Sequence, residues 1–253
     1  MLKKLFKKKE IVDYHYVVAK EKPISFTTET LQKALVNLEY VNIDKKYKVI
    51  QFTSTIATEG KTTMISNFAY LMAQRKKKVL VIDLDLRKPK MHKVFDVANE
   101  NGINDYLLGS IELSEAIKYS EEFKVDYLLS GEKTTAVVNV LTAEKLKKLI
   151  EELKDQYDYI LIDSPPVLVV SDALYIANLV DGIIFNIAQN KARKKDVREA
   201  LTSLEKTNTP IIGTLLTQVE LSGKAYDYTY KYQYIENNDW YTFTFNTKCW
   251  WWI

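Results

Sequence analysis

The stretch "TSTIATEGKTTMISNFAYL", residues 53–71, decides the fold of this chain. It ends an apolar segment, has Gly60-Lys61-Thr62 at its centre, and continues with apolar residues at helical spacing. A strand followed by such a loop and a helix is typical of phosphate binding, because backbone N–H groups at a helix start form a concavity for anions. The stretch therefore predicts a nucleotide-binding α/β protein.

The loop departs from the usual pattern of a glycine, four residues and Gly-Lys-Ser/Thr. Thr55 occupies the first glycine position, and Thr58 stands in mid-loop, where a positive φ costs threonine about 1 kcal/mol or more. We still expect Lys61 to reach the β- and γ-phosphates and the Thr62 hydroxyl to bind Mg²⁺. The alternative is a chance Gly-Lys-Thr at a helix start.

Outside the loop, apolar segments alternate with helical patterns. Such alternation indicates a parallel sheet covered on both faces. We therefore expect an α/β fold with a doubly wound, mainly parallel sheet of the P-loop NTPase type, with about six strands. The expected strands lie at 46–54, 76–89, 125–131, 157–166, 181–189 and 209–218.

The chain divides into three predicted parts. Residues 1–28 are a lysine-rich lead-in, residues 29–222 form the P-loop domain, and residues 223–253 are a flexible, tyrosine-rich tail. A helix is expected at 28–41 with Thr28 as its cap.

Bulk composition limits the function. The formal charge of +3 gives no global basic field, so we expect no nucleic-acid partner. A single cysteine, the absence of an apolar run near 18 residues and the lack of a signal-peptide core predict a cytoplasmic protein. The start "MLKKLFKKK" is interpreted as either a weak membrane-surface contact or a solvated tail.

Three carboxylates follow apolar strands. Asp83 and Asp85 end "VLVIDLD", and Asp163 ends "YILID". Because the carboxyl ends of parallel strands open onto one crevice, these side chains should meet the phosphate loop. Carboxylates beside phosphates repel each other unless a cation lies between them, which implies Mg²⁺. The alternative is that each aspartate only caps a strand end.

Together, the loop, "VLVIDLDLR" and "ILIDSPP" make the chain resemble the bacterial tyrosine kinases of the cytoplasmic capsule and exopolysaccharide type. They correspond to that family's Walker A, Walker A′ and Walker B motifs. Arg87-Lys88-Pro89 and the "SDAL" at 171–174 also match, and the resemblance covers roughly residues 25–234. The loop alone is shared with partitioning and cell-division ATPases.

The resemblance implies an ATP- and Mg²⁺-dependent protein-tyrosine kinase that regulates polysaccharide biosynthesis. Lys61 and Asp83 would be catalytic, with Asp83 as the base for the tyrosine hydroxyl, and Thr62, Asp85 and Asp163 would hold the metal. The implied nucleotide-binding residues are Thr58, Glu59, Gly60, Lys61, Thr62, Thr63 and Arg87.

The tail supports this interpretation. Tyrosines stand at every second position and match the cluster that family members phosphorylate on neighbouring copies; an alternating edge strand is the alternative. The implied acceptors are Tyr226, Tyr228, Tyr230, Tyr232 and Tyr234. The resemblance also implies two kinds of partner. One is a membrane-anchored activator of the polysaccharide co-polymerase type, which recruits the chain to the cytoplasmic face of the membrane, and the other is further copies of the chain.

The sequence departs from the family at three places. Ala57-Thr58 replaces Pro-Gly in the loop, and Thr217-Gln218 stands where relatives carry asparagine after the last strand. The helix that packs relatives into a ring reads Glu-x-x-Arg-x-x-Arg, whereas here Gln32 and Leu35 follow Glu29, which predicts weaker self-association. Two other functions stay open: a partitioning-type ATPase switch and a degenerate, non-catalytic adaptor.

Overall fold

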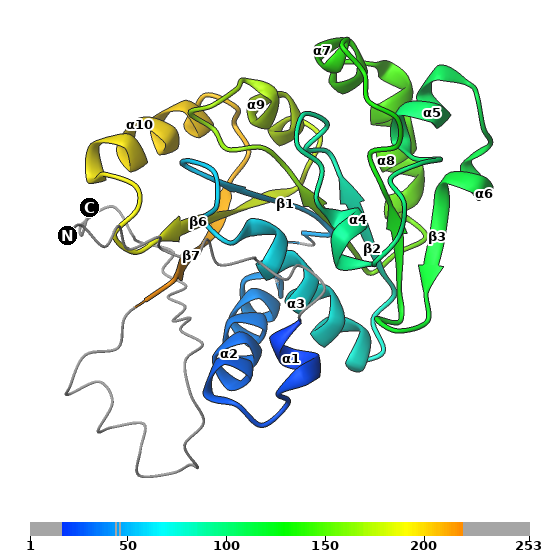
Figure 1. Ribbon diagram of the computed structural model, residues 1–253. Coiled ribbons are helices and arrows are strands. Elements are labelled where there is room, and N and C mark those ends of the chain that lie inside the picture. The colour runs from blue at the N-terminus through cyan, green and yellow to red at the C-terminus, as the bar shows by residue number, and fades with distance from the viewer. Residues whose placement is uncertain (1–16, 44, 46, 220–253) are drawn as a thin grey trace, which may run out of the picture.

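The computed structural model describes residues 17–43, 45 and 47–219, and its centre is one seven-stranded sheet (Figure 1). The strand order is β3-β4-β2-β5-β1-β6-β7. The strands are β1 (Val49–Ser54), β2 (Val79–Asp83), β3 (Ile117–Ser120), β4 (Val125–Leu128), β5 (Tyr159–Asp163), β6 (Gly182–Ala188) and β7 (Ile211–Thr217).

The predicted parallel sheet is confirmed. In the order β4-β2-β5-β1-β6-β7, every pair of neighbouring strands is parallel, and each of these strands lies within one of the expected apolar segments. The seventh strand, β3, is antiparallel to β4 and was not predicted. It is only four residues long and mostly half-buried, so it lacks the continuous apolar run that marks the inner strands.

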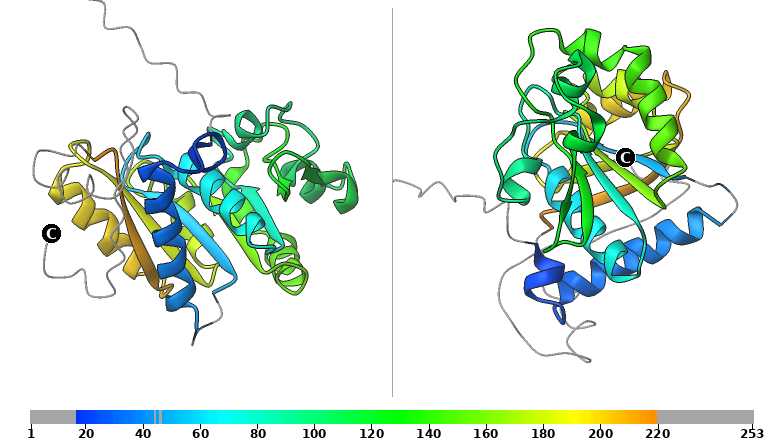
Figure 2. Two further views of the ribbon diagram at one scale, coloured as in Figure 1. Left: turned by 90° about the horizontal axis from the view of Figure 1, so that it is seen from below. Right: turned by 90° about the vertical axis from the view of Figure 1, so that its right-hand side faces the viewer.

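Helices cover both faces of the sheet (Figures 1 and 2). The apolar cluster under α1 to α4 includes Ile50 and Phe52 of β1, whereas the later helices pack on the opposite face. The helices are α1 (Val18–Glu21), α2 (Phe26–Val41), α3 (Lys61–Gln74), α4 (Met91–Val94), α5 (Ile103–Leu108), α6 (Leu113–Ala116), α7 (Val137–Leu141), α8 (Glu144–Lys154), α9 (Asp172–Ala177) and α10 (Lys194–Glu205).

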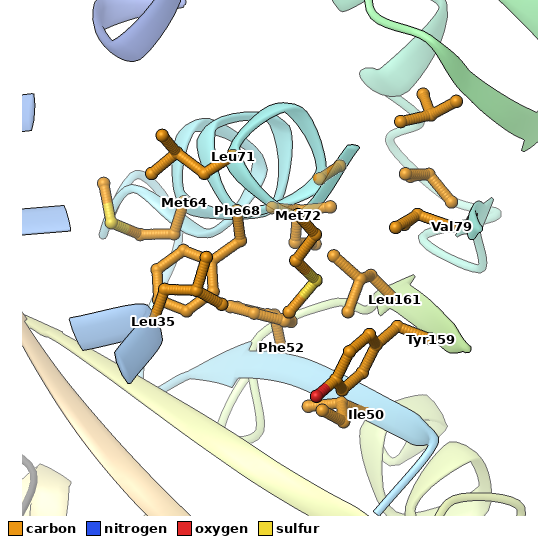
Figure 3. Packing of buried hydrophobic residues seen from close by; sticks show 14 of the residues in the cluster. Leu35, Ile50, Phe52, Met64, Phe68, Leu71, Met72, Val79, Tyr159 and Leu161 are labelled. Atoms are coloured by element: carbon orange, nitrogen blue, oxygen red, sulfur yellow. The ribbon is translucent and has the colours of Figure 1, made fainter. Parts of the chain in front are cut away.

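The packing of α3 on β1 fixes where the phosphate loop lies. Phe68 of α3 meets Phe52 of β1 edge to face, with ring centroids 5.7 Å apart, and Leu35 of α2 lies beside them (Figure 3). All three side chains are fully buried. Because the loop joins the end of β1 to the start of α3, this packing holds both of its ends.

The N-terminal boundary differs from the expectation. Helix α2 begins at Phe26, and its cap is Ser25, whose Oγ accepts the Thr28 N–H at 3.1 Å. The predicted cap at Thr28 is therefore wrong by one helical turn. Val17 and Ala19 are buried in the core beneath α3, so the last part of the expected lead-in packs with the rest of the fold.

Candidate active site

Three strand ends meet at one edge of the sheet. Asp163 at the end of β5 is aligned with Phe52 of β1 on one side and with Asp83 of β2 on the other. The phosphate loop, residues 55–60, leaves β1 at Ser54 and so begins beside these carboxylates. This register places Asp83 and Asp163 side by side at the edge of the sheet where the loop begins, as expected for the ends of parallel strands, and Asp85 follows two residues after the end of β2.

Two loop residues adopt left-handed backbone conformations. Gly60 has a φ of 83° and immediately precedes α3, and Thr58 has a φ of 65°. The positive φ expected at Thr58 is therefore confirmed. The loop keeps this shape although threonine replaces glycine, and the conformation costs about 1 kcal/mol.

Glu59 fixes the loop to the neighbouring strand. Its side chain is fully buried, Oε2 accepts the Ile56 N–H at 2.8 Å, and Oε1 accepts the Ala188 N–H of β6 at 3.0 Å. Burial raises the pKa of this carboxyl, and the two N–H donors partly offset that rise. The Glu59 side chain therefore shapes the loop, and only its backbone is left to face a phosphate.

Lys61, the first residue of α3, lies folded over the end of β1. Only 7% of it is exposed, and its Nζ donates to Ser54 Oγ at 3.3 Å. Burial lowers the pKa of the ammonium, while Asp163 and Asp85 act in the opposite direction. A buried cation at the start of a helix, beside backbone N–H groups, suits a phosphate anion.

Thr62 and Asp163 form the best-defined pair of the site. The Thr62 hydroxyl donates to Asp163 Oδ2 at 2.8 Å, and both residues are buried. Burial raises the pKa of Asp163 to about 6, and Lys61 opposes this rise. Asp163 Oδ1 is also buried but has no hydrogen-bond partner within the described part of the chain.

That unpartnered oxygen fits a hydrated magnesium ion. Among the described residues, no three His, Cys, Asp or Glu side chains converge closely enough to hold a metal by themselves. Mg²⁺ usually keeps several waters and takes one or two protein oxygens together with phosphate oxygens. The Thr62 hydroxyl and the Asp163 carboxylate are the oxygens that this arrangement offers.

Asp83 is a fully buried carboxylate. Its Oδ2 accepts the N–H groups of Lys90 and Met91, each at 3.0 Å, and its Oδ1 accepts that of Asp85 at 3.1 Å. Burial and the nearby Asp163 raise its pKa well above the ordinary range. The side chain thus organises the turn from 84 to 91, which follows β2.

Asp85 and Arg87 belong to that turn. Asp85 is half-buried, burial raises its pKa, and its Oδ1 accepts the Lys88 N–H at 3.1 Å. Arg87 forms a bidentate ion pair with Asp172 of α9, with Nε–Oδ2 and Nη2–Oδ1 distances of 2.6 and 3.1 Å. The guanidinium thus connects the turn to α9.

Three residues at the loop were not given this role by the sequence. The Thr217 hydroxyl donates to the Glu59 carbonyl at 2.9 Å, and Lys191 and Gln218 both donate to the Thr58 carbonyl. The sequence singled out Thr217 and Gln218 only because relatives carry asparagine at this position after the last strand. The predicted acceptors Tyr226 to Tyr234 lie outside the described residues.

Comparisons with known proteins find relatives of similar sequence and similar fold. The AAA domain family model matches residues 47–217. Tyrosine-protein kinase YwqD of Bacillus subtilis is 33% identical over 214 residues, which are 85% of this chain and 90% of that protein. The kinase domain of the Escherichia coli tyrosine kinase ETK superposes with a TM-score of 0.77 at 26% identity, covering 83% of this chain and 84% of that one.

A second structural relative is more distant. The septum site-determining protein MinD of Pyrococcus horikoshii, solved with Mg-ADP, gives a TM-score of 0.58 at 27% identity and covers 67% of this chain and 70% of that one. Within the described ranges, none of the helices has the length and hydropathy that spanning a bilayer requires.

Proposed function

Because this chain belongs to the family of bacterial tyrosine-protein kinases, we propose that it transfers the γ-phosphoryl group of ATP to tyrosine hydroxyls. The observation that carries the proposal is the pairing of Thr62 with Asp163 beside the buried Lys61. This set supplies a cation, a hydroxyl and a carboxylate next to backbone N–H groups at a helix start. Phosphoryl transfer needs such positioning and charge neutralisation more than covalent chemistry.

Lys61 has the role of binding the β- and γ-phosphates. Its ammonium donates to Ser54 Oγ at the long distance of 3.3 Å, so this bond is easily exchanged for bonds to phosphate oxygens. Burial lowers the pKa of this ammonium, and the carboxylates of Asp163 and Asp85 oppose that change. Arg87, by contrast, acts through its ion pair with Asp172, which holds the turn that carries Asp85.

Thr62 and Asp163 would hold Mg²⁺, with Asp85 reaching it through water. When bound there, Mg²⁺ would supply positive charge beside the phosphates. Asp163 Oδ1 offers the acceptor for a metal-bound water, since it is buried and unpartnered among the described residues. Its pKa of about 6 leaves the carboxyl mainly ionised near neutral pH, as a metal site requires.

Asp83 is proposed as the base that orients or deprotonates the incoming tyrosine. Its Oδ1 accepts one N–H, whereas Oδ2 accepts two, so Oδ1 is the oxygen with acceptor capacity left for a hydroxyl. Its raised pKa makes it a stronger base than an exposed aspartate. The three backbone donors also hold the carboxylate in a fixed position.

The acceptors and partners follow from the family. We propose that Tyr226 to Tyr234 of one copy enter the site of another, with residues 223–253 as the tail. We also propose that a membrane-anchored activator recruits the chain to the inner membrane face, where it regulates capsular or exopolysaccharide synthesis. The replacements at Gln32 and Leu35 favour weaker self-association than in relatives.

Two alternatives have less support. A partitioning-type ATPase would resemble MinD most, yet the TM-score is 0.58 for MinD and 0.77 for the ETK kinase domain. A degenerate adaptor would be favoured by a collapsed loop, yet Thr58 and Gly60 keep left-handed conformations. The kinase therefore remains the better-supported function.

The test is phosphotyrosine mapping by mass spectrometry. The purified chain is incubated with Mg-ATP, with and without the cytosolic peptide of its membrane activator, and Lys61→Met is the matched control. Phosphate on the tail tyrosines of the wild type only is the expected result. ATP hydrolysis by the wild type without any phosphotyrosine would favour the ATPase switch instead.

A further inference from the structure

Three non-glycine residues in and around the phosphate loop adopt left-handed backbone conformations. They are Thr58 in the loop (φ 65°), Asn190 after β6 (φ 61°) and Gln218 after β7 (φ 55°). Asparagine tolerates this region, but a β-branched threonine does not adopt it without support from its surroundings. The left-handed conformation of Thr58 therefore depends on contacts with neighbouring residues.

Two side chains donate hydrogen bonds to the carbonyl oxygen of Thr58. Lys191 Nζ donates to it at 2.8 Å, and Gln218 Nε2 donates to it at 3.0 Å. Lys191 also lies 3.3 Å from Thr58 Oγ1. These donors come from the segments that follow β6 and β7, and we call the pair the Lys191–Gln218 clamp.

The two segments that carry the clamp are themselves joined to each other and to the loop. The Gln189 N–H donates to the Thr217 carbonyl at 2.9 Å, which ties the end of β6 to the end of β7. The Thr217 hydroxyl donates to the Glu59 carbonyl, and Glu59 Oε1 accepts the Ala188 N–H. The clamp therefore has a rigid base.

From these contacts we propose that Lys191 and Gln218 are positioning residues that hold Thr58 in the conformation a glycine would otherwise supply. The peptide unit between residues 58 and 59 is planar, and its C=O and N–H point in opposite directions. Fixing the Thr58 carbonyl toward the clamp therefore also fixes the direction of the Glu59 N–H. This proposal rests on the proposed nucleotide site, because that N–H belongs to the phosphate loop.

The first experiment reads the conformation directly. Backbone carbon chemical shifts of Thr58, measured by NMR on the nucleotide-free chain, report a left-handed residue. We expect the left-handed signature in the wild type and in the controls Gln156→Ala and Lys195→Met. We expect its loss in the double variant Lys191→Met Gln218→Ala. If the double variant keeps the signature, the clamp does not hold the loop.

The second experiment is a double-mutant cycle on Mg-ADP affinity, measured by calorimetry. Gln218→Ala should weaken binding about five- to tenfold, the equivalent of the threonine strain, because Thr58 then relaxes out of the binding conformation. In the Thr58→Gly background the same change should weaken binding less than about twofold, because glycine adopts a positive φ freely. Equal losses in the two backgrounds would overturn the proposal.

Charge is controlled separately. Lys191→Met removes a cation that contacts the phosphate loop, and Lys195→Met removes a cation four residues further along the chain. Only a larger loss of Mg-ADP affinity for Lys191→Met than for Lys195→Met supports the clamp. If the wild type does not bind Mg-ADP at all, the proposed function is wrong. The NMR signature of Thr58 still shows in that case whether the clamp holds the loop.

Discussion

Removing Arg87 should destabilise the fold more than removing Asp172, although the two side chains form one ion pair. The asymmetry comes from their burial, since 45% of the Arg87 side chain is exposed and only 1% of the Asp172 side chain. Arg87→Ala leaves a buried carboxylate without its cation. Asp172→Ala leaves the Arg87 guanidinium free to rotate into the solvent.

The magnitudes follow from that difference. Breaking a fully buried pair by removing one partner costs about 3 to 5 kcal/mol. Arg87 is nearly half exposed, so water reaches the vacated position and the cost of Arg87→Ala falls to about 2 kcal/mol. Asp172→Ala loses two hydrogen bonds but no longer buries a charge, so it should cost about 1 kcal/mol or less. The double variant should match Asp172→Ala, which gives a coupling free energy of about 2 kcal/mol.

The assay is urea unfolding of the nucleotide-free chain, followed by circular dichroism, for the wild type, both single variants and the double variant. Arg87→Lys is the conservative control, because it keeps the charge and loses the bidentate geometry, and it should fall between wild type and Arg87→Ala. Mg-ADP affinity is measured on the same proteins.

The result that refutes this reasoning is an Arg87→Ala variant as stable as the wild type. If that variant also lost Mg-ADP affinity, Arg87 would be a phosphate ligand, as its place after the Walker A′ motif first indicated.

Three further predictions concern the site and the tail. Lys61→Met should abolish tail phosphorylation, seen by mass spectrometry, and leave the unfolding midpoint almost unchanged, because burial already disfavours the ammonium. The folded pKa of Asp163, about 6, lies above its ordinary 3.8, so the metal-free native state retains a proton that the unfolded chain releases. Its unfolding free energy should therefore fall as pH rises from about 4 to about 6, more steeply in the wild type than in Asp163→Asn, as urea titrations at several pH values can show. Phosphorylation of Tyr226 to Tyr234 adds about −7.5 to −10 charges against a formal +3, so sedimentation should find the phosphorylated protein closer to monomeric than the unmodified one.

Much of the fold could be predicted because its strands are buried on both faces. A buried parallel strand is a continuous apolar run, and the residue that ends the run marks the edge of the sheet where sites form. Asp83 and Asp163 were placed together on that argument alone. The positive φ at Thr58 was also predictable, since Thr58 stands in mid-loop at a position where related loops carry glycine.

The remaining contacts depend on segments far apart in the chain. Nothing local indicates that the Glu59 carboxylate meets the Ala188 N–H, or that Arg87 pairs with Asp172, because both contacts exist only after the sheet and helices have packed. The start of α2 was missed for a local reason. Ser25 and Thr28 are both good caps one turn apart, and the difference between them is smaller than sequence propensities resolve.

The central place of β1 in the sheet has a consequence for synthesis on the ribosome. Ile50 pairs with Leu161 on one side and with Gly182 on the other, so β1 emerges long before either neighbour exists. Until then the apolar face of α3 has no sheet to cover it, and the nascent chain should need chaperone protection. The loop gains its last supports only when residue 218 has been made. The proposed nucleotide site therefore cannot be completed before residue 218 of the 253 has been synthesised.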